Sequence, residues 1–160
     1  MPQIVPARSL ELHEVEARFG LRQVREPSFF PEWQDVDIEL DERDRYWLDK
    51  AKNNFLSLIK FRLHEEVVKI SILAPLLAVS GLGSAPFIPK SEERFPLFGL
   101  LTNGRHFMFV KLSKQAQPVY GLSELFTLFK QKNEMYQVAT ILQQLGRLVM
   151  KQDWDIQKVG

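Results

Sequence analysis

Hydrophobic residues recur at helical spacing over much of the chain. Starting near Asp41, such a stripe predicts a long helix with charged residues on its other face, and its apolar positions are Trp47, Leu48, Ala51, Phe55, Leu58 and Ile59. A second helix is expected from about Glu65 to Ser80, kinked at Pro75 and ended by Gly81. Its apolar positions are Val67, Ile70, Leu73, Ala74 and Leu77. Because its polar face is thin, we expect this helix to be central.

Shorter amphipathic patterns occur towards both ends of the chain. Ser9 can cap a short helix that Gly20 ends, with an apolar face formed by Leu12, Val15 and Phe19. The aromatic residues between Pro27 and Trp33 are expected to fix an extended or turned segment to the core. Ser123 can cap a helix with Leu125, Phe126 and Phe129, and Asn133 can cap a longer one with Tyr136, Ala139, Ile141, Leu142, Leu145 and Leu148.

The strongest local signal is a hairpin. Asn103-Gly104 separates the apolar run 97–102 from the run 105–112, and this dipeptide is typical of a type I′ turn, in which both central residues need positive φ. Phe107 and Phe109 point to one side of the second strand, whereas Met108, Val110 and Leu112 point to the other. A strand with apolar residues on both faces is usually covered on both faces.

These elements predict an α+β fold that is mostly helical, with one central β-hairpin. At 160 residues the chain is long enough for one core and too short for two ordinary domains. We therefore expect a single domain over residues 1–150. Residues 151–160 lack a sustained apolar period and are expected to form a frayed tail.

The formal charge is close to zero, but it is unevenly distributed. Residues 1–89 carry 11 basic and 14 acidic side chains, and residues 90–160 carry 10 and 6, so the halves have net charges of −3 and +4. A basic half can favour a polyanion such as DNA, although phosphate contacts need clustered cations. The candidate DNA-contacting residues are Arg105, Lys111, Lys114, Lys130 and Lys132. A solvated surface is the competing interpretation of all five.

Several chemistries lack the residues they need. The chain has no cysteine, and its three histidines are far apart in sequence, so the sequence predicts no metal centre built from these ligands. The longest apolar stretch, 70–82, is shorter than the ~20 residues needed to cross a bilayer, and no signal-peptide pattern begins the chain. We expect a cytoplasmic protein without a membrane partner.

Several stretches, taken in order, resemble one family. They are LHEVEARFGL (12–21), FFPEWQ (29–34), APLL (74–77), FPLFGLLTNGRHFMFVKL (95–112) and NEMYQVATILQQLGRL (133–148). Together they are similar to the restriction endonuclease subunit R-like proteins, which are related to the nuclease domain of type I restriction enzyme R subunits. The resemblance implies that the chain is the remnant of a three-layer α/β/α restriction-endonuclease-like fold.

The resemblance also implies a lost active site. The family's PD-(D/E)xK core uses an Asp on one strand and Glu-x-Lys on the next, and its two carboxylates hold magnesium against the scissile phosphate. Here the chain passes from residues 86–90 almost directly to 95–99, and no Asp or Glu is followed two residues later by Lys. We therefore expect no catalytic residue, no metal ligand and no cofactor; magnesium would be expected only of the complete family domain. The carboxylates nearest this junction are Glu92 and Glu93, for which a solvated loop is the favoured interpretation.

Three functional hypotheses follow. The first is a degenerate member of the R-like family without nuclease activity. The second is a protein-interaction module that pairs with itself or with a full-length paralogue, because deleting the catalytic strands would leave a hairpin with apolar faces and an open edge. The third is a weak DNA-binding protein that uses its basic carboxy-terminal half.

Overall fold

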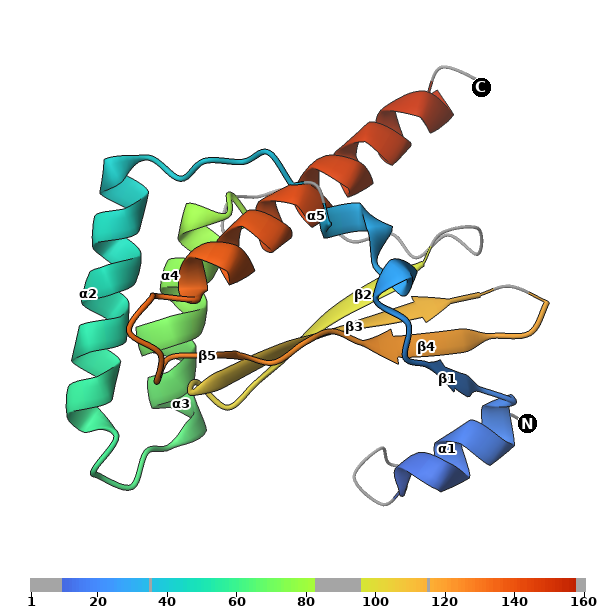
Figure 1. Cartoon of the computed structure of the whole chain (residues 1–160), viewed down its shortest axis with the longest axis horizontal. Coiled ribbons are helices and arrows are strands. Elements are labelled where there is room, and N and C mark those ends of the chain that lie inside the picture. The colour runs from blue at the N-terminus through green and yellow to red at the C-terminus, as the bar shows by residue number, and fades with distance from the viewer. Residues whose placement is uncertain (1–9, 35, 83–95, 115, 158–160) are drawn as a thin grey trace.

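A computed structural model describes residues 10–34, 36–82, 96–114 and 116–157. It is a mixed α/β structure in which helices pack against a five-stranded mixed sheet (Figure 1). The strands are β1 (Arg22–Val24), β2 (Leu97–Thr102), β3 (His106–Ser113), β4 (Val119–Leu122) and β5 (Phe126–Thr127). The prediction of helices with a β-hairpin is confirmed, but the hairpin is only part of a larger sheet.

The sheet is built around β3. Its strand order is β1-β4-β3-β2, and β5 pairs with β3 beside this path. β2, β4 and β5 each run antiparallel to β3, whereas β1 runs parallel to β4. The segment from Ser123 onward was expected to form a helix, which is wrong. The Ser123 hydroxyl accepts a hydrogen bond from the backbone N–H of Phe109 at 2.9 Å, so it serves strand pairing and caps no helix.

The β2–β3 turn differs from the predicted type. Thr102 pairs with Phe107, which leaves four residues between the paired positions, and Gly104 has φ +82° whereas no non-glycine residue described has positive φ. A type I′ turn is therefore excluded. The Asn103 side-chain oxygen instead accepts hydrogen bonds from the backbone N–H groups of Arg105, at 3.0 Å, and His106, at 2.9 Å. This side-chain-to-backbone bonding is the turn chemistry that asparagine favours.

The amino-terminal helices follow the sequence pattern in outline. α1 (Leu12–Phe19) ends at Gly20 with φ +62°, as expected. Its N-terminal cap is Glu11, whereas the expected cap, Ser9, lies outside the described residues.

Two short 3₁₀ turns, η2 (Pro27–Phe29) and η3 (Pro31–Trp33), carry the aromatic segment, in which Phe30 is buried. α2 (Glu42–Leu58) begins directly after Asp41, close to where the long helix was expected to start. The Asp41 carboxylate accepts a hydrogen bond from the backbone N–H of Asp44 at 2.7 Å.

The second long helix is interrupted by a π turn. It consists of α3 (Glu65–Val68), the π-helical η4 (Lys69–Leu73) and α4 (Ala74–Val79). Pro75 has no N–H and its ring would crowd the carbonyl four residues earlier, so a wider turn here relieves the conflict. The extra residue rotates the helix faces. Ile72 and Leu76 are buried, whereas Ile70, placed in the predicted apolar face, is 72% exposed, so that prediction is wrong.

The carboxy-terminal helix α5 (Met135–Gln157) starts where Asn133 was expected to cap it. The Asn133 side-chain oxygen accepts from the backbone N–H of Met135 at 3.1 Å. The helix continues to Gln157. Its buried hydrophobic residues are Met135, Val138, Ala139, Ile141, Leu142 and Leu145.

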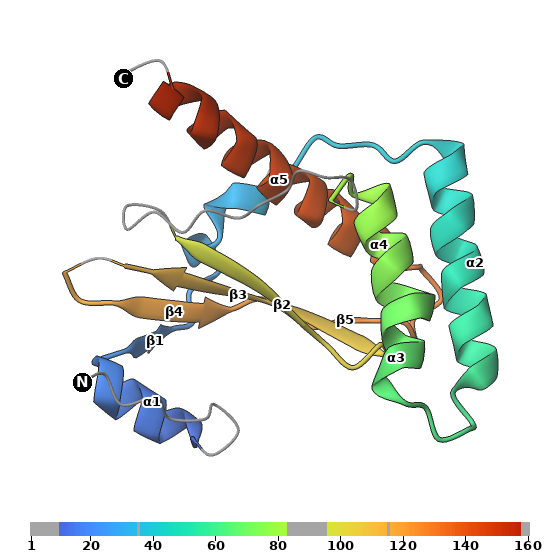
Figure 2. The same cartoon turned by 180° about the vertical axis from the view of Figure 1, so that it is seen from behind.

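The helices are distributed unequally over the two faces of the sheet. α5 and the turns η2 and η3 lie on one side, α1 lies on the other side beside β1, and α2 to α4 pack at the end of the sheet that holds the β2–β3 turn (Figures 1 and 2). Phe107 and Phe109 point from β3 into the core that α5 covers, and each is 1% exposed. We call this side the inner face and the opposite side the outer face.

Candidate functional site

The outer face of β2 and β3 carries a continuous set of apolar side chains. In the β2–β3 register Leu97 lies opposite Leu112, Gly99 opposite Val110 and Leu101 opposite Met108, and directly opposed residues share a face. Leu97 is 40% exposed and Leu101 is 56% exposed. Figures 1 and 2 show no described helix over this part of the sheet. We call this surface the open face and define it as Leu97, Leu101, Met108, Val110 and Leu112.

The open face adjoins an unpaired strand edge. Among the described residues, β2 is hydrogen-bonded only to β3, so its other edge has no strand partner within that part of the chain. The β2 sequence Leu-Phe-Gly-Leu-Leu-Thr has no charged residue. Natural edge strands usually carry a charge, a proline or a bulge that discourages pairing with another chain. None of these protects the six residues of β2.

Lys111, one of the candidate DNA-contacting residues, lies on neither the open face nor this edge. Its ammonium group points to the inner face, where it donates a hydrogen bond to the Phe29 carbonyl at 2.8 Å and pairs with the Glu32 carboxylate. It also lies over the Phe29 ring, at 4.8 Å from the centroid, and Lys111 as a whole is 8% exposed. Lys111 is therefore buried within the fold and is not the solvent-facing DNA contact that was expected.

The other four candidate DNA-contacting residues do not form a single cluster. Arg105 lies in the β2–β3 turn, and its carbonyl accepts from the backbone N–H of Leu128. That bond brings the turn close to the segment that holds Lys130 and Lys132, both exposed. Lys130 is partly neutralised by an ion pair with Glu134 at 2.6 Å. Lys114 is exposed directly after the opposite end of β3.

A different basic surface lies on α2, and sequence reasoning missed it. Tyr46 is 59% exposed and Trp47 is 47% exposed, with their ring centroids 5.7 Å apart. The Lys50 ammonium lies 5.1 Å from the Trp47 centroid and 5.9 Å from that of Tyr46. Arg43 and Asn54 are exposed on the same side of the helix, since residues three and four apart are neighbours. We call Arg43, Tyr46, Trp47, Lys50 and Asn54 the α2 platform.

The spacing of the α2 platform was available in the sequence. Positions 43, 46, 47 and 50 follow the i, i+3, i+4, i+7 pattern of one helix face. Trp47 had been placed with Leu48, Ala51 and Phe55, which are buried on the adjacent side of the helix. A tryptophan at the boundary of two stripes can belong to either one.

The described residues show neither a metal-ligand cluster nor a membrane-spanning segment. No group of three or more histidine, aspartate or glutamate side chains in the described part of the chain could hold a metal ion. Glu92 and Glu93 lie outside the described residues. None of the helices within the described ranges has the length and apolar character required to cross a membrane.

Comparison with known proteins found no matching family model, no matching curated protein and no matching solved structure.

Proposed function

We propose that this protein is an interaction module that pairs with a second copy of itself through the open face and the adjoining β2 edge. The observation that carries the proposal is the uncovered set of apolar side chains on β2 and β3, two of which, Leu97 and Leu101, are more than one-third exposed. Contiguous exposed apolar surface on a soluble domain marks an interaction site. No catalytic group is required for this function.

A second copy is the partner whose chemistry fits best. When two β2 edges pair symmetrically, each residue lies opposite or close to the same residue of the other copy. A charged strand would therefore bring like charges together. β2 and the open face contain no charged side chain, and the one lysine of this part of β3 points inward. Strand addition at an open edge also supplies main-chain hydrogen bonds, whose geometry is the same for any copy of the chain.

The experiment is sedimentation velocity over about 1–100 µM, the range in which weak specific association is measurable. We expect reversible dimerisation that Leu101→Lys weakens at least about tenfold, because a charge introduced twice at a symmetric apolar contact must be desolvated. Leu125→Lys is the matched control, since Leu125 is also a leucine, is 50% exposed and lies outside the open face. A strictly monomeric wild type, or equal effects of the two variants, would contradict the proposal.

Nucleic-acid binding is a second candidate function, and the α2 platform favours it. Exposed aromatic rings provide faces on which unpaired bases stack, and neighbouring lysine and arginine neutralise phosphates. The test is fluorescence anisotropy with a labelled single-stranded oligonucleotide at several salt concentrations. The candidate would be supported if the affinity for the oligonucleotide fell steeply with salt and also fell in Trp47→Ala. Phe61→Ala is the control and should keep the wild-type affinity, since the Phe61 side chain is also exposed, at 59%. Binding that is insensitive to salt or to Trp47 would remove this candidate.

Descent from a restriction R-like nuclease remains our proposal for the origin of the chain. Its support is the order of the similar segments at 12–21, 29–34, 74–77, 95–112 and 133–148. A non-catalytic relative should not cut plasmid DNA in the presence of magnesium. Cleavage that copurifies with the protein and responds to mutation of its carboxylates would contradict the loss of nuclease activity.

A further inference from the structure

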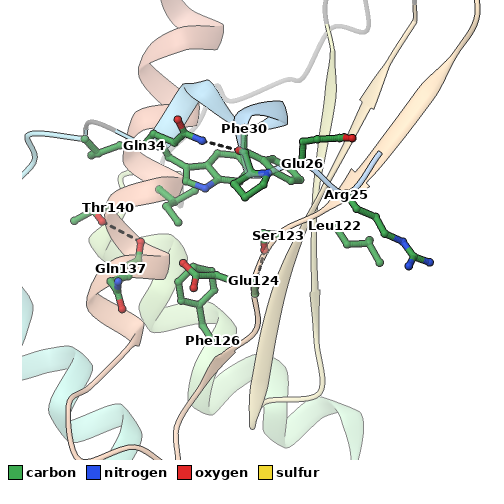
Figure 3. Close-up of a pocket in the computed structure, with 14 residues that line it drawn as sticks. Arg25, Glu26, Phe30, Gln34, Leu122, Ser123, Glu124, Phe126, Gln137 and Thr140 are labelled. Carbon is green, nitrogen blue, oxygen red and sulfur yellow. Dashed lines mark hydrogen bonds between the residues drawn. The ribbon is translucent and has the colours of Figure 1, made fainter. Parts of the chain in front are cut away.

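A cavity of about 620 Å³ lies on the inner side of the molecule, away from the open face. It is bounded by the segment from Arg25 to Gln34, by the link between β4 and β5, and by the first half of α5 (Figure 3). This volume is within the usual range of small-molecule pockets, which is roughly 300–1,000 Å³. The cavity takes no part in the proposed self-association.

Aromatic rings form the apolar wall of the cavity, and the core holds them in place. Phe30 lies between η2 and η3, Trp33 ends η3, and Phe126 begins β5. Phe30 and Trp33 have ring centroids 4.7 Å apart, and Phe109 links Trp33 to Phe126 through centroid distances of 5.4 Å and 6.2 Å. Phe30 and Phe126 are buried, whereas Trp33 is half-buried. The Trp33 ring is therefore the aromatic surface most available to a ligand.

The ionisable groups around the cavity are predominantly acidic. Glu26 and Glu124 are carboxylates, and Arg25 is the one cation among the described lining residues. The Arg25 guanidinium is hydrogen-bonded to the Gln23 side chain at 3.4 Å, and Figure 3 shows it directed away from the other labelled side chains. Glu124 lies beside Phe126 in the same view. Glu26 is likewise directed away from the other labelled side chains in Figure 3, so Glu124 is the ionisable group that lies beside the aromatic wall.

We propose that this cavity binds an organic cation, namely an ammonium group on an aliphatic stem such as a lysine side chain carries. A cation is attracted to the negative face of an indole ring and to a nearby carboxylate, and the aliphatic stem is matched by apolar side chains such as Ile141. The same features disfavour an anion. Gln137 and Thr140 on α5 provide polar groups that can orient the ammonium.

Three probes of equal chain length, n-pentylammonium, 1-pentanol and pentanoate, distinguish recognition of the positive charge from simple binding of an aliphatic chain in the cavity. Each is titrated into the isotopically labelled full chain, and binding is followed by the indole N–H resonance of Trp33, assigned with Trp33→Phe. We expect saturable shifts with pentylammonium at an affinity about fivefold or more above that of pentanol, as a cation–π contact supplies. Pentanoate should not bind. The indole resonance of the exposed Trp47 should not move.

Variants test which group recognises the charge. Glu124→Gln should lower the affinity for pentylammonium severalfold and leave pentanol unchanged, and because Glu124 is exposed the variant should keep the wild-type spectrum. Glu39→Gln is the matched control, as Glu39 is an exposed carboxylate outside the cavity lining. Equal affinity for pentylammonium and pentanol, tighter binding of pentanoate, or an unchanged affinity in Glu124→Gln would overturn the proposal.

Discussion

The ammonium group of Lys111 on β3 forms a largely buried ion pair with the carboxylate of Glu32 on η3. The same ammonium donates to the Phe29 carbonyl at 2.8 Å, so one side chain fixes the aromatic segment to the inner face of the sheet. The other carboxylate oxygen of Glu32 is buried and has no hydrogen-bond partner among the described residues. The pair therefore connects two segments that are distant in sequence, at the cost of desolvating both charges.

Breaking this pair should destabilise the fold. Lys111→Met leaves the Glu32 carboxylate buried without its cation, and we expect a loss of about 3–5 kcal/mol in the free energy of unfolding. The double variant Lys111→Met with Glu32→Gln should lose less, because the stranded charge is gone. Urea unfolding of both variants and of Glu32→Gln completes the double-mutant cycle. Losses that simply add would show that the two residues do not interact.

Gly104 in the β2–β3 turn should be much less tolerant of a side chain than Gly20. A Cβ at Gly104 would lie 2.7 Å from the Phe55 ring and 2.9 Å from Val68, and the residue has φ +82°. Gly20 also has positive φ, +62°, but nothing lies within 4 Å of its Cβ position. We expect Gly104→Ala to cost about 2–4 kcal/mol, from backbone strain and overpacking, and Gly20→Ala about 1 kcal/mol. Equal shifts in the urea midpoint would contradict the packing of the turn on α2 and α3.

Phe109 is central to the core. It is 1% exposed, and its ring lies within 5.4 Å of Trp33 and 6.2 Å of Phe126, measured between centroids. Phe109→Ala should cost about 3–5 kcal/mol, since the cavity it leaves adds to the lost burial. Phe129→Ala, at a 58% exposed position, should change stability by less than about 1 kcal/mol. If thermal melts of the two variants coincide, β3 is peripheral to the core.

Stability at alkaline pH should depend on Tyr136. Burial, together with the nearby Asp49 carboxylate, raises the pKa of Tyr136 to about 12 from the ordinary value of 10.0. Above pH 10 the unfolded chain loses this proton while the folded chain keeps it, so stability falls as pH rises from 10 towards 12. Urea unfolding at pH 9 to 11.5 should show a shallower decline for Tyr136→Phe than for wild type. Parallel declines would show that Tyr136 makes no contribution.

Periodicity located the longest helices and the hairpin because each has many residues with a consistent preference. α2 and α5 begin after Asp41 and Asn133, whose side chains bond the first turn of each helix. β1, β4 and β5 span two to four residues apiece, and pairing with β3 or β4 determines their conformation. Their own residues carry too little pattern to predict a strand.

The surfaces were predicted less well than the elements. The parity of β3 places Lys111 on the same side as Phe107 and Phe109, so its inward direction was available from the alternation alone. The partner that makes such burial favourable, Glu32, lies 79 residues away, and no local pattern identifies it. The π turn at Lys69–Leu73 likewise shifts which residues of α4 are buried, and Pro75 predicted a kink without its form. The cavity is formed by three separated segments and has no sequence signal.

Amide hydrogen exchange of β2, compared at about 2 µM and about 200 µM protein, tests the proposed self-association most directly. The account predicts that the backbone N–H groups of Leu97–Thr102 that face away from β3 exchange more slowly at the higher concentration, because a second copy then pairs with this edge. Those of α2 should exchange equally at both concentrations. Concentration-independent exchange throughout β2 would contradict pairing at this edge.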